Sequence, residues 1–261
     1  MTEQLRQDFT RWCVEDLFTP EMIQGAALLQ EALDFHLLGL YRSLDLATEL
    51  AAPTTPAALA ESLGYIDSAF ITLEAMLDRL SARFDFVTRT ESDGTPSFQH
   101  TGEVATPPRE IADNEKDMAA LGDEYVSPLE FLQFGADHWV RSLKDEPDFL
   151  DAILSGRESE FQELWFRATN TDPLQNVHGI MGAKAIDMLL PKGRILEIGG
   201  GTGNGIRNLF KHLAAKNELD RVEHYHFTDI SAKFIMGTRH EIRADYPDVS
   251  TDWRFADLNN P

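Results

Sequence analysis

The chain has 261 residues, 43% of them apolar, and carries 44 acidic against 23 basic residues, for a formal charge of −21. This length is enough for two modest domains with a real core. So acidic a surface repels phosphate backbones and anionic lipids, so we expect neither nucleic acid nor a membrane as a partner. No apolar run approaches the roughly 20 residues of a membrane span. The first residues lack a cationic segment followed by an apolar one, so we expect no signal peptide. The single cysteine, Cys13, cannot form an internal disulfide. Together these features predict a cytoplasmic protein.

The N-terminal part of the chain predicts a helical accessory domain. Apolar residues recur at helical spacing from residue 4 to about 50. Thr55 before Pro56 is typical of a helix start, and this second helical segment is expected to end at Gly64. The apolar face of the next helix is expected to consist of Ile71, Leu73, Met76, Leu77 and Leu80.

Strand-forming runs at 86–90 and 97–100 flank an Asp-Gly turn, which predicts a β-hairpin. Helix, turn, helix and hairpin together predict a winged helix-turn-helix within residues 1–110. Many such motifs bind DNA, but here the second helix carries Asp67, Glu74 and Asp78 against Arg79. Reading a groove requires Arg, Lys, Asn or Gln. We therefore interpret the motif as a packing or dimerisation module, which makes a homodimer one expected arrangement.

Residues 111–190 are predicted to form a helical linker and lid region, and the pattern of predicted secondary structure changes after them. In residues 191–261, strands and helices alternate, an order that predicts a parallel sheet with right-handed crossovers. The fold class is therefore α/β, a mostly helical N-terminal region followed by a Rossmann-like sheet. Strands are expected at 194–198, 224–228 and 251–256, and helices at 204–216 and 231–245.

A glycine-rich loop, Gly199–Gly203, lies between the first of these strands and its helix, where an α/β sheet binds ligands. The dinucleotide motif G-x-G-x-x-G fails in both registers, because Asn204 and Ile206 stand where its third glycine belongs. Glu197 ends the strand before the loop, and an acid there repels a pyrophosphate but suits a cation. S-adenosylmethionine carries both an ammonium and a sulfonium group.

Two more acids end the next two strands. Asp229 is placed to accept hydrogen bonds from ribose hydroxyls, and Asp257 from an adenine amino group. The alternative role for both is helix N-capping or a solvated strand end. The predicted cofactor-binding residues are Glu197, Gly199, Gly200, Gly201, Gly203, Asp229, Ile230, Asp257 and Leu258.

The stretches 194–203, 226–231 and 255–258 resemble the C-methyltransferase domains of polyketide synthases, which are class I S-adenosylmethionine-dependent methyltransferases. The motif Phe-Thr-Asp-Ile-Ser at 227–231 is the most specific part of this resemblance. A weaker match lies at 163–166, where that family has the start of a substrate-side lid. The N-terminal winged helix resembles the dimerisation domain of small-molecule O-methyltransferases. The resemblance implies that Glu197, Gly199, Gly201 and Asp229 hold the cofactor.

This resemblance implies a methyltransferase of specialised, polyketide-like metabolism, acting on a carbon or oxygen of a small or carrier-protein-bound substrate. Two alternatives remain open: an S-adenosylmethionine-binding enzyme that does not methylate, and a regulatory or interaction module. The chain ends just after the third expected strand, and three parallel strands leave an exposed sheet edge. We therefore expect the remainder of the methyltransferase domain to act as a partner and to supply the catalytic base.

Histidines offer few further candidates in this sequence. His178 is the candidate base within the chain, with a structural role as the alternative. His224 and His226 share a strand face, which is a metal-ligand geometry, but the sequence offers no third ligand. We therefore expect no metal.

Overall fold

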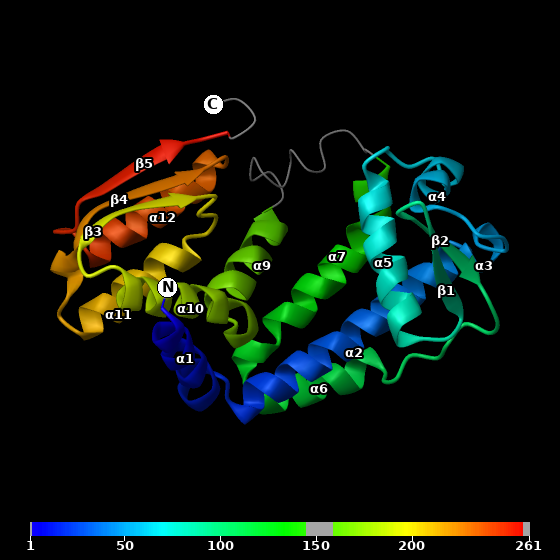
Figure 1. Ribbon diagram of the computed structural model, residues 1–261, viewed down its shortest axis with the longest axis horizontal. Helices are drawn as coiled ribbons and strands as arrows, with labels where there is room; N and C mark the ends of the chain where they lie inside the picture. The colour runs from blue at the N-terminus through cyan, green and yellow to red at the C-terminus, as the bar shows by residue number, and fades with distance from the viewer. Residues whose placement is uncertain (1, 145–158, 258–261) are drawn as a thin grey trace. The chain divides into compact units, whose positions relative to one another are not determined.

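The computed structural model describes residues 2–144 and 159–257 (Figure 1). The chain divides into two compact units, one of Met1–Gly25, Gly122–Pro128 and Ala152–Pro261, the other of Ala26–Leu121 and Leu129–Asp151. The sequence predicts three domains, at 1–110, 111–190 and 191–261. These domains do not coincide with the two compact units, and they stay a prediction. None of the described helices is both long and apolar enough to cross a membrane.

The helices are α1 Glu3–Trp12, α2 Pro20–Ser43, α3 Leu46–Glu49, α4 Pro56–Ser62, α5 Ala69–Arg83, α6 Ile111–Leu121, α7 Ser127–Leu143, α9 Ser159–Asn170, α10 Pro173–Leu189, α11 Asn204–Ala215 and α12 Ala232–Asp245. Short π- and 3-10 helices cover Cys13–Leu17, Asp123–Tyr125 and Leu219–Arg221. The strands are β1 Val87–Ser92, β2 Thr95–His100, β3 Gly193–Ile198, β4 Val222–Asp229 and β5 Thr251–Phe255.

The unit around Ala26–Leu121 contains helix, turn, helix and hairpin in the predicted order. Thr55 caps α4 by accepting a hydrogen bond from the Ala58 N–H at 3.2 Å, and Pro56 occupies the first turn. The hairpin of β1 and β2 is antiparallel, and its turn residues Asp93 and Gly94 both have positive φ, at 52° and 76°. Its local elements are therefore those that the sequence predicted.

One prediction about α5 is wrong. The side chain of Ile71 is 61% exposed, whereas Leu73, Met76, Leu77 and Leu80 are at most 2% exposed. At about 100° per residue, Ile71 lies about 200° around the helix from Leu73 and so on the opposite side. The apolar face of α5 therefore excludes Ile71.

The other unit contains a three-stranded parallel sheet in the order β3-β4-β5. Two right-handed crossovers that step in the same direction place α11 and α12 on one face of the sheet (Figure 1). Core side chains between sheet and helices include Ile206, Phe210, Tyr225 and Phe227, all at most 3% exposed. The predicted mixed α/β fold with a parallel sheet is confirmed.

The opposite face of this sheet is open to solvent in the described part of the chain. Leu196 and Ile198 of β3 point to it and are 62% and 57% exposed. Because side chains alternate along a strand, the residues facing the helices are Ile195 and Glu197. The sheet thus buries one face and leaves an apolar strip on the other.

Candidate functional site

The loop between β3 and α11 turns sharply. Three of its glycines have positive φ: Gly199 at 69°, Gly201 at 54° and Gly203 at 83°. This backbone region favours glycine because a side chain there is strained. The loop is held against the neighbouring strand, since the Gly200 N–H donates to the Thr228 carbonyl at 2.9 Å.

Close packing explains why glycine stands at positions 200 and 205. A Cβ at Gly200 would overlap the Phe227 ring, and a Cβ at Gly205 would overlap the carboxylate of Glu197. The loop and the first turn of α11 therefore pass directly over side chains of β3 and β4. A side chain at either position would therefore force the loop or α11 away from these strands.

The side chain of Asp229, at the end of β4, binds the glycine loop through a hydrogen bond. One carboxylate oxygen accepts from the Gly201 N–H and the other from the Ser231 N–H, both at 2.7 Å, and the side chain is buried. Each oxygen keeps a second lone pair. The N-cap of α12 is Ser231, not Asp229, so Asp229 instead joins the glycine loop to the turn before α12.

Glu197 is half-buried on the helix-facing side of β3, opposite Phe227 in the strand register. Its Oε2 accepts a 3.0 Å hydrogen bond from the Tyr225 hydroxyl. Burial raises the pKa of Glu197 to about 7, and the negative charge of Asp229 raises it further, while the Tyr225 hydrogen bond acts in the opposite direction. A cation beside Glu197 would favour its ionised form, so this site is suited to a positively charged ligand.

The other predicted site residues lie as follows. Ile230 is 46% exposed directly after Asp229, so its apolar surface is available to a ligand. The Ala256 N–H donates to the Asp229 carbonyl at 3.0 Å, which brings half-buried Asp257 to the same end of the sheet. Leu258 lies outside the described residues.

His178 is exposed on α10. Its Nδ1 lies 3.1 Å from the Gln175 carbonyl oxygen within the same helix. This is a local contact on one helix, and no hydrogen bond in the described part of the chain links the His178 ring to the glycine loop. Its role as a base stays a prediction.

A polar network behind the loop was missed by the sequence analysis. Asn176 Oδ1 accepts from the Nδ2 atoms of Asn204 and Asn208, at 2.8 and 2.7 Å. Thr202 Oγ1 lies 2.7 Å from Thr169 Oγ1 and accepts from Asn170 Nδ2 at 2.8 Å. The spacing of Asn204 and Asn208, four residues apart on one helix face, was the available signal.

Comparison with known sequences links part of the chain to polyketide synthases. The polyketide synthase-like protein Preu9 of Preussia isomera is 46% identical over 59 residues, which are 23% of this chain and 3% of that protein. Prosolanapyrone synthase of Alternaria solani is 44% identical over 59 residues, 23% of this chain and 2% of that protein. No protein-family model matches the chain.

Solved structures extend the similarity to nearly the whole chain. The CurJ carbon methyltransferase matches 98% of this chain with a TM-score of 0.61 and 19% identity, and the CMeT domain of the citrinin polyketide synthase matches 99% with a TM-score of 0.57 and 14% identity. In each case the match covers 64% of the other chain. This chain thus spans less than two thirds of these relatives and a small fraction of the synthases. The expected resemblance is confirmed: the chain has the fold of carbon methyltransferases and is similar in sequence to polyketide synthases over part of its length.

Proposed function

We propose that this chain forms the S-adenosylmethionine-binding part of a methyltransferase of polyketide-like metabolism. The observation that carries the proposal is the pair of carboxylates, Glu197 and Asp229, that flank a glycine loop at the carboxyl ends of two adjacent parallel strands. Ligands bind at this edge of open α/β sheets. Two neighbouring acids select a cation over a pyrophosphate.

The residues present fit S-adenosylmethionine. Glu197, whose carboxylate lies against Gly205 in the first turn of α11, would face the positive charge of the ligand. Asp229 would use its remaining lone pairs for ribose hydroxyls. Ile230 would pack against the adenine and Asp257 would accept from its amino group. The glycine loop would allow the close approach of ligand to backbone. When bound, this cofactor supplies an electrophilic methyl group for in-line transfer to a nucleophile.

The acceptor is proposed to be a carbon or oxygen of a small or carrier-protein-bound substrate, which is supported by the similarity to polyketide synthases. The chain's contribution would be to hold and orient the cofactor, since positioning alone accounts for much of a bimolecular barrier. We expect the remainder of the methyltransferase domain to supply the general base. His178 is the alternative candidate within this chain.

Partners and location complete the proposal. The open apolar strip at Leu196 and Ile198 supports a partner that covers this face, for which the remainder of the methyltransferase domain is our candidate. Exposed Phe70 and Ile71 on α5, at 39% and 61%, support a homodimer through the other unit. A cytoplasmic location remains part of the proposal, and no nucleic acid is expected as a partner.

The cofactor claim is tested by isothermal titration calorimetry of the full chain with S-adenosylmethionine. We expect one site per chain, and a loss of affinity of tenfold or more in Asp229→Ala, because this change also releases the Gly201 and Ser231 N–H groups. The matched control is Asp248→Ala, an exposed acid before β5 at the opposite end of the strand, which should bind as the wild type does. The proposal fails if the wild type does not bind, or if both variants bind equally well.

A further inference from the structure

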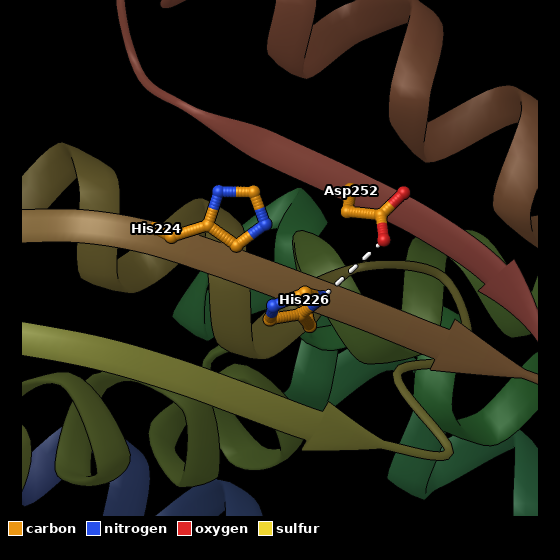
Figure 2. A group of neighbouring side chains, drawn as sticks. All are labelled: His224, His226 and Asp252. Atoms are coloured by element: carbon orange, nitrogen blue, oxygen red, sulfur yellow. Dashed lines mark ion pairs between the residues drawn. The ribbon is translucent and has the colours of Figure 1, made fainter.

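Three potential metal ligands meet on the open face of the sheet, away from the glycine loop. His224 and His226 are two residues apart on β4 and therefore point to the same face. The parallel register places Asp252 of β5 directly opposite His226. Figure 2 shows the three side chains and the ion pair between His226 and Asp252.

The distances are short enough for a common ligand. One donor atom from each of the three side chains lies within 4.8 Å of the other two. His226 Nδ1 and Asp252 Oδ2 are 3.4 Å apart, and the two imidazole centroids are 4.2 Å apart. All three residues are half-buried on the face that the proposed partner would cover, so in this chain by itself an ion reaches them from solvent.

A neighbouring hydroxyl orients one ligand. Ser250 Oγ lies 2.7 Å from His224 Nδ1. When Nδ1–H donates to this oxygen, Nε2 presents its lone pair to the cluster. Metal-binding histidines commonly have such a partner on the ring nitrogen that does not bind the metal.

We propose that His224, His226 and Asp252 form a zinc site that joins β4 to β5. Two imidazoles and one carboxylate are a donor set that Zn²⁺ accepts, with water in the fourth position. Tetrahedral zinc separates its ligand atoms by about 3.4 Å, given bonds of about 2.1 Å. The His226–Asp252 pair already has this separation, and rotation of the half-buried side chains closes the rest.

Two arginines oppose the ion and give the proposal a distinctive consequence. Arg194 Nη2 lies 3.2 Å from His226 Nε2, and Arg254 Nε donates to Asp252 Oδ2 at 2.6 Å. Arg194 makes Nε2 the accepting nitrogen, which places the proton of a neutral His226 ring on Nδ1, the nitrogen that faces Asp252. Arg254 occupies a lone pair of Asp252 Oδ2, and both guanidinium groups repel a divalent cation. Removing the charge of exposed Arg194 should therefore strengthen zinc binding, which a purely structural cluster of ion pairs would not predict.

The test uses the full chain, treated with a chelator and titrated with Zn²⁺ alone by calorimetry. We expect one zinc ion per chain, with affinity reduced tenfold or more in His226→Ala and in Asp252→Asn, and increased severalfold in Arg194→Gln. His240→Ala is the matched control, since His240 is exposed on α12, and it should bind as the wild type does. Zinc should also raise the melting temperature of the wild type, because it binds only the folded arrangement.

Circular dichroism identifies any variant that does not fold, and His224→Gln then replaces it as the ligand-loss variant. Absence of a saturable site in the wild type overturns the proposal. So does a site that persists unchanged in the folded ligand variants or that is lost in His240→Ala. Weaker binding in Arg194→Gln would likewise contradict it.

Discussion

The Tyr225 hydroxyl donates a 3.0 Å hydrogen bond to Oε2 of Glu197, so that a core aromatic residue of β4 holds the acid at the end of β3. Tyr225 is itself packed edge-to-face against Phe210 of α11, and burial raises the pKa of its own hydroxyl. The phenol therefore remains a hydrogen-bond donor at neutral pH. The protonation state of Glu197 is set by these surroundings.

The first prediction concerns pH. Because the pKa of Glu197 is about 7 in the free protein, the carboxylate is largely protonated at pH 6 and about half ionised at pH 7. A cationic ligand prefers the ionised form, so affinity for S-adenosylmethionine should rise about fivefold from pH 6 to pH 7. Calorimetry at both pH values measures this change. In Glu197→Gln the affinity should be lower and flat over this range; a wild type that binds more tightly at pH 6 would contradict the assignment.

The second prediction concerns the tyrosine. Tyr225→Phe removes the hydrogen bond that favours ionised Glu197, so the pKa of Glu197 should rise by about one unit. At pH 7 the affinity for S-adenosylmethionine should then fall about fivefold. A merely structural role for Tyr225 would lower affinity equally at all pH values, whereas here the loss should shrink as pH rises. Calorimetry from pH 6.5 to pH 7.5 distinguishes the two.

The third prediction concerns the loop. Gly200→Ala places a methyl group against the Phe227 ring, which is fully buried and cannot retreat without disturbing the core. We expect at least tenfold weaker binding of S-adenosylmethionine together with a lower melting temperature. Gly182→Ala in α10 is the matched control, because a Cβ there meets nothing within 4 Å and alanine favours a helix. Equal binding by the two variants would mean that the loop does not approach the ligand.

Local features of this chain were predictable from its sequence. The helix start at Pro56, the Asp93-Gly94 turn and the buried stripe of α11 depend on neighbouring residues along the chain. Glycines between a strand and a helix likewise mark the loop directly. Ile71 was misassigned because it was grouped with the stripe by its apolar side chain, although its spacing from Leu73, about 200° around a helix, already places it on the opposite side.

Features that depend on strand register were not predictable. The contact of Tyr225 with Glu197 and the place of Asp252 beside His226 both require knowing which residues of neighbouring parallel strands lie opposite each other. A shift of one residue would move each side chain to the other face of the sheet. The sequence therefore identified two histidines but no third ligand. The inclusion of Met1–Gly25 in the unit that contains the sheet is also a long-range result of packing, since Cys13 and Leu17 bury against Val177.

The last prediction concerns stability. Asp187 of α10 is only 8% exposed in its side chain and accepts hydrogen bonds from His212 and Lys216, both at 2.9 Å, and from Arg221. Burial alone would raise the pKa of Asp187, but these hydrogen bonds outweigh it and hold the pKa well below its usual range. Asp187→Asn leaves cationic Lys216 and Arg221, together with the His212 ring, without their shared carboxylate, so we expect a loss of about 3 kcal/mol in the free energy of unfolding at pH 7.

The sign of the pH dependence follows from the lowered pKa of Asp187. Its stabilising effect is fully present above the pKa of an unfolded aspartate, near 4, and is lost as pH falls further towards the folded value. Urea unfolding of wild type and Asp187→Asn should therefore differ most at neutral pH and converge in acid. Glu218→Gln, which loses a more exposed partner of Lys216 and Arg221, should cost far less at pH 7. If the two variants lose equal stability, or if the gap for Asp187→Asn widens in acid, then Asp187 does not anchor α10 to α11 through its charge.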